Sequence, residues 1–120
     1  TLGGDTSMSR PPIYDAEIVV QSLTLDSWAQ SELQENKISK TIKLMKLEAE
    51  GFEPEIIRGG LSVLSQIEYI AADLGWERGL EQDCTIPEVV NLLLENRFRI
   101  KTVSRDGGHF LFENIDLANN

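Results

Sequence analysis

Three glutamates lie close to one glycine near the middle of the sequence: Glu48, Glu50 and Glu53 fall within six positions, beside Gly51. Carboxylates crowded in a cleft raise one another's pKa, so one of them could take a proton from a substrate hydroxyl. The alternative is a solvated acidic loop near a helix start, where the charge stabilises the helix by roughly 0.3–1 kcal/mol. We take Glu48 and Glu50 as candidate catalytic residues and Glu53 as a candidate for binding substrate.

The same carboxylates could hold a divalent cation, because hard cations prefer oxygen ligands. No histidine or further aspartate falls in this loop, and the only histidine, His109, has no second nitrogen or nearby cysteine to complete a zinc site. Cys84 is the only cysteine and has no partner that points to nucleophilic catalysis. We therefore expect no metal and assign no chemistry to His109 or Cys84.

A second group of candidates follows a nearly continuous apolar stretch at 67–72. Asp73 ends that stretch, where a lone carboxylate is costly to bury unless it is paired or reaches the mouth of a cleft. In the next residues, the aromatic face of Trp76 suits a sugar or ring, and the guanidinium of Arg78 suits a carboxylate or phosphate. The alternative is an ordinary loop in which Glu77 balances Arg78. We take Asp73, Trp76 and Arg78 as candidates for binding substrate.

Hydrophobic periodicity predicts the elements that position these residues. Residues 1–16 carry glycines and prolines without an apolar period, so we expect a loop or extended arm there. A strand is predicted over 17–25, and Asp26 is expected to cap a helix over 27–36. That helix should pack through Trp28, Ala29 and Leu33.

Strands and helices alternate in the rest of the chain. Strands are predicted over 41–47 and 67–73, and the helix between them is expected to run from Pro54 to Gln66. Its core-facing side chains should be Ile57, Leu61 and Leu64.

The last part of the sequence predicts one more helix and a hairpin. Thr85 and Glu88 fit a capping box, in which each side chain satisfies the other's backbone N–H, so a helix should begin there. Strands at 98–103 and 109–112 flank the small, flexible residues at 105–108. With right-handed crossovers these elements give an open α/β sheet that ends in an antiparallel hairpin.

Functional sites of open α/β sheets lie at the carboxyl ends of the parallel strands. In this chain those ends are the loops at 48–53 and 73–78, which hold all six candidate residues. We therefore expect the two loops to face one cleft.

Composition limits the class of protein. The chain has 120 residues, of which 41% are hydrophobic and 26% charged, as expected for one folded domain. A net charge of −9 repels phosphate backbones and argues against nucleic acid as a partner. No apolar run is long enough to span a membrane, and a single cysteine cannot form an intrachain disulfide. We expect a soluble protein of a reducing, cytoplasmic compartment.

Four short motifs follow one another along the sequence: TLDSW at 24–28, IKLMKLEAEGFE at 42–53, IRGG at 57–60 and DLGWERG at 73–79. This order resembles the signature of the FkbM-type methyltransferases, which use S-adenosylmethionine, and the similarity runs from about residue 6 to residue 112. Glu48 stands where that family more often has aspartate. The exchange keeps the charge and lengthens the side chain by one methylene.

The resemblance implies a Rossmann-like class I methyltransferase sheet: three-layer and mostly parallel, with a carboxyl-terminal antiparallel hairpin. The family's first strand, its glycine-rich turn and the acidic residue that holds the donor's ribose would precede Thr1. Gly3 and Gly4 follow no strand and precede no helix, so they do not replace that turn. We expect 17–116 to be the carboxyl-terminal half of such a domain and 117–120 to be a tail.

The implied function is the acceptor-side part of an enzyme that moves a methyl group from S-adenosylmethionine to the hydroxyl oxygen of a small molecule. Such an enzyme aligns the hydroxyl with the methyl group and removes the proton of the hydroxyl. Glu48 and Glu50 are the candidates for those tasks. The full-length parent would use S-adenosylmethionine, whereas the chain alone should bind no cofactor and be inactive.

Two other interpretations stay open. A half-domain leaves one edge of its strand at 42–47 unpaired, and exposed edges recruit other strands, so the chain could be a non-catalytic, self-associating or protein-binding module. Such a homo-oligomer would form edge to edge or by exchange of the arm over 1–16. The other interpretation is an acidic adaptor for a basic protein surface, whose binding would fall steeply with added salt.

Overall fold

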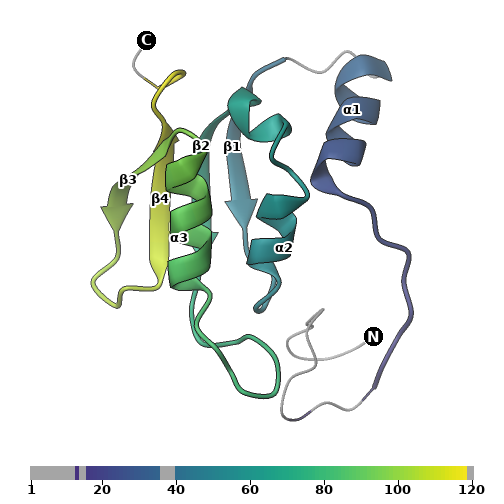
Figure 1. Ribbon diagram of the computed structural model, residues 1–120, viewed down its shortest axis with the longest axis vertical. Coiled ribbons are helices and arrows are strands. Elements are labelled where there is room, and N and C mark those ends of the chain that lie inside the picture. Colours follow the sequence, from purple (N-terminus) through teal and green to yellow (C-terminus); the bar gives the residue numbers. More distant parts are fainter. Residues whose placement is uncertain (1–12, 14–15, 36–39, 119–120) are drawn as a thin grey trace.

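The structure is a computed structural model that describes residue 13 and residues 16–35 and 40–118. Most of the predicted arm over 1–16 and the end of the predicted tail lie outside the described residues. Figure 1 shows the elements of the described part, which follow one another as α1 (Leu25–Glu35), β1 (Ile42–Leu47), α2 (Glu53–Arg58), the 3-10 helix η1 (Val63–Gln66), β2 (Ile67–Asp73), α3 (Ile86–Glu95), β3 (Phe98–Val103) and β4 (His109–Asn114).

The strands form one mixed sheet in the order β1-β2-β4-β3. β1 and β2 are parallel, and β4 is antiparallel to both β2 and β3. The predicted α/β class and the carboxyl-terminal hairpin are confirmed. Parallel pairing, expected for most of the sheet, occurs among the described strands only between β1 and β2, because β4 lies between β2 and β3.

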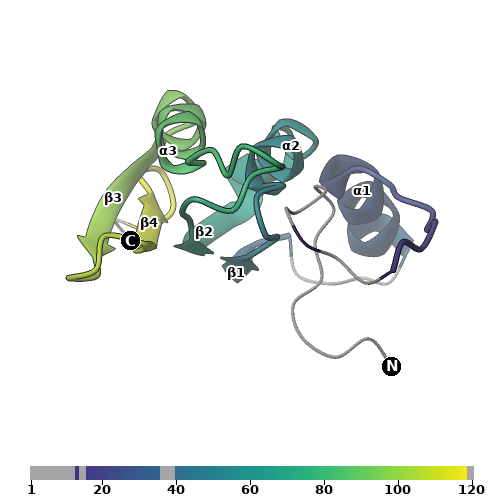
Figure 2. The ribbon, with the colours of Figure 1, turned by 90° about the horizontal axis from the view of Figure 1, so that it is seen from below.

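Helices α2 and α3 cover one face of this sheet, as the view along the strands in Figure 2 shows. The described residues therefore form two layers, and they do not include the third layer that we expected. The core lies between the sheet and these helices, and its fully buried apolar side chains include Ile57, Ile70, Val89, Leu93, Phe98 and Phe112.

The strand predicted over 17–25 is not formed. Residues 16–24 have no regular secondary structure, and α1 begins at Leu25. A strand needs a paired neighbour for its backbone groups, and no described strand of the sheet pairs with this segment. The predicted cap is also wrong, because the Thr24 hydroxyl, rather than Asp26, accepts the N–H of Ser27, at 3.0 Å.

Asp26 instead ties α1 to η1. Its carboxylate accepts the backbone N–H groups of Ser62, at 3.1 Å, and Val63, at 2.9 Å. Ala29 of α1 is buried as predicted, but Trp28 is 43% exposed, so the expectation that Trp28 packs into the core is wrong. The helix thus contacts the rest of the fold through this polar anchor and through Ala29 and Leu33, which pack on the core as predicted.

The single helix predicted from Pro54 to Gln66 is interrupted. α2 ends at Arg58, and Leu61, expected to face the core, is exposed. Gly60 approaches α1 so closely that a Cβ at this position would lie 2.7 Å from a methyl carbon of Leu25. A tertiary contact therefore breaks a helix that the periodicity alone would continue.

Candidate functional site

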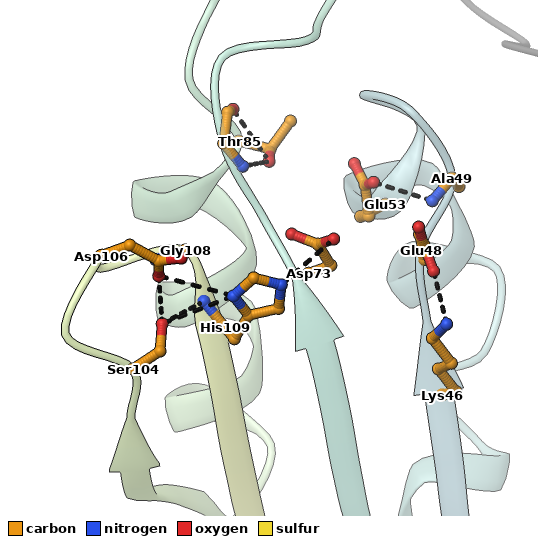
Figure 3. A network of polar contacts seen from close by, with 11 residues as sticks. Lys46, Glu48, Ala49, Glu53, Asp73, Thr85, Ser104, Asp106, Gly108 and His109 are labelled. Atoms are coloured by element: carbon orange, nitrogen blue, oxygen red, sulfur yellow. Dashed lines mark hydrogen bonds and ion pairs between the residues drawn. The ribbon is translucent and has the colours of Figure 1, made fainter. Parts of the chain in front are cut away.

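The carboxyl ends of β1 and β2 meet at one edge of the sheet. Glu48 follows β1, Asp73 is the last residue of β2, and β4 begins at His109 directly opposite Asp73. Figure 3 shows these side chains, together with Glu53, at this edge. We call Glu48, Glu53, Asp73 and His109 the carboxyl-edge site. The two predicted loops meet at this edge, where Arg78 bonds to Gly51; that they line a cleft stays a prediction.

His109 lies between two aspartates. Its Nε2 is 3.5 Å from Oδ2 of Asp73, and its Nδ1 is 3.4 Å from Oδ1 of Asp106 in the turn between β3 and β4. Asp106 also accepts hydrogen bonds from the Ser104 hydroxyl and, at 3.0 Å, from the Gly108 N–H. These bonds, that of Ser104 foremost, lower the pKa of Asp106 to about 2. The anchored Asp106 carboxylate thereby holds the imidazole in place opposite Asp73.

Glu48 is paired with a lysine of its own strand. Nζ of Lys46 lies 2.6 Å from Oε2 of Glu48, and this hydrogen-bonded ion pair lowers the pKa of Glu48. We expected crowding with other carboxylates to raise that pKa, and this expectation is wrong for Glu48 because the ammonium is in direct contact. Glu50, in the turn that follows, has a left-handed backbone with φ of 50°.

Glu53 is buried, with only 2% of its surface exposed. Its Oε1 accepts the N–H groups of Ala49, at 2.9 Å, and Gly51, at 3.3 Å, and so shapes the turn after β1. Its Oε2 is also buried and has no hydrogen-bond partner among the described residues. A buried polar oxygen without a partner is costly, so a hydrogen-bond donor placed there by a ligand would be favoured.

Arg78 ties the turn after β1 to the loop after β2. Its Nη1 donates to the carbonyl of Gly51, at 2.7 Å, and to Glu55, at 2.8 Å. Hydrogen bonding in this ion pair lowers the pKa of Glu55 and raises the pKa of Arg78. The structure therefore gives Arg78 a positioning role, and its predicted part in binding substrate stays a prediction.

The loop between β2 and α3 is closed by Thr85. The Thr85 N–H donates to the carbonyl of Gly75 at 2.9 Å, and the Thr85 hydroxyl accepts the Gly75 N–H at 3.3 Å. The predicted capping box is therefore wrong: the Thr85 side chain caps no N–H of α3, and Glu88 forms an ion pair with Arg58. Trp76 lies on this loop with 71% of its surface exposed, so its ring is open to a ligand.

A groove of about 1070 Å³ lies beside β1. One wall is formed by residues 22–25 and Trp28, the other by residues 41–46, and side chains of α2 and η1 complete it. The lining is mostly apolar and includes Leu23, Leu44 and Phe52. We call this feature the β1 groove. It lies away from Asp73 and His109, neither of which contributes to its walls.

A metal site would need a cluster of acidic, histidine or cysteine side chains, and a cradle for the methyl donor would need backbone that a ligand can approach. Residues 13, 16–35 and 40–118 contain no group of three or more histidine, cysteine or acidic side chains that could hold a metal ion. S-adenosylmethionine, implied by the resemblance, would need backbone open to a ligand. At Gly51 a Cβ would lie 2.7 Å from the backbone of Glu77 and Arg78, so that space is filled, whereas no atom lies within 4 Å of a Cβ at Gly75. We assign no described residue to the donor.

Sequence reasoning missed His109, Asp106 and Ser104. The only available signal was the small-residue turn before the single histidine, which predicts the hairpin but not its neighbour. His109 meets Asp73 because β4 pairs with β2 as well as with β3. That strand order is a property of the folded sheet and is not written in the local pattern.

Comparison with known proteins identifies the family. A family model described as the methyltransferase FkbM domain matches residues 2–100, a range that includes β1, β2 and both acidic loops. Searches of curated proteins and of solved structures gave no significant match. Within the described residues, no helix is both long enough and apolar enough to cross a bilayer. Because the family model covers most of the chain, this protein belongs to the FkbM methyltransferase family.

Proposed function

We propose that this chain forms the acceptor side of an S-adenosylmethionine-dependent O-methyltransferase: it holds a small molecule by its hydroxyl group and accepts the proton that the hydroxyl loses. Family membership supplies the reaction class, methyl transfer. The observation that carries the proposal is the carboxyl-edge site, where acidic side chains and an imidazole from three strands meet at the edge at which open α/β sheets bind ligands.

We take Asp73 as the first candidate to accept the proton, because its carboxylate faces the imidazole of His109, whereas that of Glu48 is held by Lys46. The ion pair with Lys46 lowers the pKa of Glu48 and makes it a weaker base. Oδ2 of Asp73 lies 3.5 Å from Nε2 of His109, and an imidazole nitrogen can donate or accept a hydrogen bond. Glu50, the other candidate from the sequence, lies in the turn beside Glu48 and remains a candidate for the same task.

Glu53 and Trp76 have features that suit binding of the acceptor. The buried, unpartnered Oε2 of Glu53 would accept a hydrogen bond from a hydroxyl or amine of the ligand. The exposed ring of Trp76 offers a flat apolar surface for a sugar or another ring. Arg78 contributes by holding the two loops together, as its bonds to Gly51 and Glu55 indicate.

The first test asks whether this chain holds the donor. Calorimetric titration of S-adenosylmethionine into the 120-residue chain should give no binding heat, because the proposal assigns none of the described residues to the donor. Binding in the micromolar range would contradict the assignment of this chain to the acceptor side.

The second test measures methyl transfer from S-adenosylmethionine to a panel of small hydroxyl compounds by the protein encoded in the complete reading frame. Replacement Asp73→Asn should lower kcat about 100-fold or more and leave donor affinity unchanged, since general bases contribute on the order of 10²–10⁴. Glu48→Gln and Glu50→Gln report on the other candidates. The control, Glu95→Gln, removes an exposed carboxylate from the far end of α3 and should have no effect.

Two outcomes would contradict the proposal. Unchanged kcat in Asp73→Asn would remove Asp73 as the proton acceptor, and a loss in Glu50→Gln would then assign that task to Glu50. Transfer to amines with none to hydroxyl groups would overturn the assignment of the acceptor class.

A further inference from the structure

The hydroxyl of Ser104 lies at the centre of the turn between β3 and β4. It donates a hydrogen bond to Oδ1 of Asp106 and accepts the backbone N–H of His109 at 3.0 Å. The carbonyl of Ser104 accepts the N–H of Gly107 at 2.9 Å, and the N–H of Ser104 donates to the carbonyl of His109 at 2.8 Å. The turn over 104–109 is therefore held by its own side chains and backbone.

This turn also holds the backbone at the end of β2. The carbonyl of Gly108 accepts the N–H of Leu74, the residue after Asp73, at 2.8 Å. A Cβ at Gly108 would lie 3.2 Å from the carbonyl oxygen of Leu74, so the two backbones pack closely. Asp73 and His109 are paired across β2 and β4, and their side chains therefore project from the same face of the sheet.

The imidazole of His109 has a defined orientation between two carboxylates, as Figure 3 shows. Asp106 is ionised above about pH 2, and a carboxylate can only accept hydrogen bonds, so Nδ1 is the donor in the 3.4 Å contact with Oδ1 of Asp106. With Nδ1 turned to Asp106, Nε2 is the nitrogen that faces Oδ2 of Asp73, at 3.5 Å. One ring thus connects the anchored carboxylate of the turn with the carboxylate at the end of β2.

The arrangement of these side chains differs from that of a serine nucleophile. In a Ser-His-Asp triad, the serine and the acid bind opposite nitrogens of the imidazole. In this turn the Ser104 hydroxyl, at 3.5 Å, and Asp106, at 3.4 Å, both face Nδ1 of His109, and Ser104 donates its proton to Asp106. The network is therefore suited to holding the ring, and Nε2 is left for Asp73.

We propose that Asp106 and His109 are positioning residues for methyl transfer: Asp106 orients the imidazole, and the imidazole orients the Asp73 carboxylate toward the acceptor hydroxyl. This proposal rests on the proposed function, in which Asp73 takes the proton of the hydroxyl. Asp106 and His109 act through Asp73 and do not touch the acceptor. A carboxylate that can rotate spends part of its time turned away from the hydroxyl, so fixing its orientation raises kcat without strengthening acceptor binding.

Methyl transfer by the protein encoded in the complete reading frame, measured on the same panel of small hydroxyl compounds, tests the proposal. His109→Ala should lower kcat about tenfold or more and leave the acceptor KM nearly unchanged. On the Asp73→Asn background the same replacement should cost nothing further, because residues that act through one another are not additive. The matched control Arg105→Ala, at an exposed residue of the same turn, should keep the wild-type kcat.

Two forms of rescue separate positioning from a general loss of structure. Added imidazole should restore part of the kcat of His109→Ala, because the missing ring can be supplied from solution. Asp106→Ala should lower kcat, whereas Asp106→Asn keeps an oxygen that accepts the N–H of Nδ1 and should retain more of it. Equal losses in the two Asp106 variants would contradict the orienting hydrogen bond.

Failure of this proposal differs from failure of the proposed function. If the losses in His109→Ala and Asp73→Asn multiply, His109 acts independently of Asp73 and the positioning proposal is overturned, while Asp73 keeps its task. If Asp73→Asn keeps the wild-type kcat, the proposed function loses its proton acceptor. Crystal structures give a readout that needs no turnover: the Asp73 carboxylate should have one conformer in the wild type and more than one in His109→Ala. A single, unchanged conformer in that variant would overturn the proposal whether or not methyl transfer is found.

Discussion

The sheet has two sides, a hairpin side where α3 packs on β3 and β4, and a β1 side that lies beside α1. The two sides differ in which apolar side chains they leave exposed. Where α3 packs on the sheet, Phe98 and Phe112 are 1% and 0% exposed, and the ring of Phe110 stacks on that of Phe112 with centroids 5.7 Å apart. On the side of β1 and α1, Leu44 and Trp28 remain 56% and 43% exposed beside a large groove. The difference is local, because Leu47 on the β1 side is 2% exposed and Val103 of β3 is 53% exposed; the β1 side is set apart by its apolar groove.

The largest expected effect separates the two sides directly. Phe112→Ala should lower the free energy of unfolding by about 3–5 kcal/mol, because it leaves a cavity in a fully buried part of the core. Leu44→Ala, on the half-exposed β1 side, should cost below about 1 kcal/mol. Urea unfolding followed by circular dichroism measures both. Equal costs would show that the two sides share the stability of the fold.

The next effect concerns the turn after β1, where Gly51 packs against the loop that follows β2. In Gly51→Ala, the new Cβ would lie 2.7 Å from backbone atoms of Glu77 and Arg78, at a φ of 98°. We expect a loss of about 2–3 kcal/mol from the left-handed backbone and the steric contact together. Gly79→Ala is the control: its φ is 67°, but no atom lies within 4 Å, so only the backbone cost of about 1 kcal/mol should remain. Equal unfolding midpoints for the two variants would refute the close contact.

A smaller effect tests the polar anchor of the β1 side. Asp26→Ala removes the acceptor for the N–H groups of Ser62 and Val63 and should lower stability by about 1–2 kcal/mol. Because α1 forms a wall of the β1 groove, the variant should also speed amide hydrogen exchange in α1 more than in α3. Uniform acceleration in both helices would argue against a local role for Asp26.

The smallest effect is a pH dependence on the hairpin side. The pKa of Asp106 is about 2, below its ordinary value of 3.8, so the ionised carboxylate stabilises the folded state. That contribution is present above about pH 4 and is lost as the pH falls through about 2. The wild type should therefore unfold at a higher temperature than Asp106→Asn near neutral pH, and the gap should close in acid. A gap that widens in acid would contradict the lowered pKa.

Local patterns in the sequence predicted the elements whose own residues decide their structure. The apolar run that ends at Asp73 predicted β2, and the small residues at 105–108 predicted the hairpin. The strand predicted over 17–25 is not formed, because a strand also needs a neighbouring strand, which no local pattern supplies. The helix predicted from Pro54 failed because Gly60 meets Leu25, a contact between residues far apart in the sequence.

The candidate site divides in the same way. The positions of Glu48 and Asp73 at the ends of parallel strands could be predicted, because the rule for α/β sheets depends only on the order of the elements. The burial of Glu53 and the ion pair of Glu48 with Lys46 could not, because they depend on the path of one tight turn. His109 required the strand order of the complete sheet.

The length of the turn between β3 and β4 governs which face of the sheet carries the imidazole. Successive side chains of a strand point to opposite faces, so an insertion that slides β4 by a single position against β2 would turn His109 toward the helices and away from Asp73. The hydrogen bonds that Asp106 receives from Ser104 and Gly108 fix that length. A few small residues in an exposed turn thus determine whether His109 lies on the same face of the sheet as Asp73.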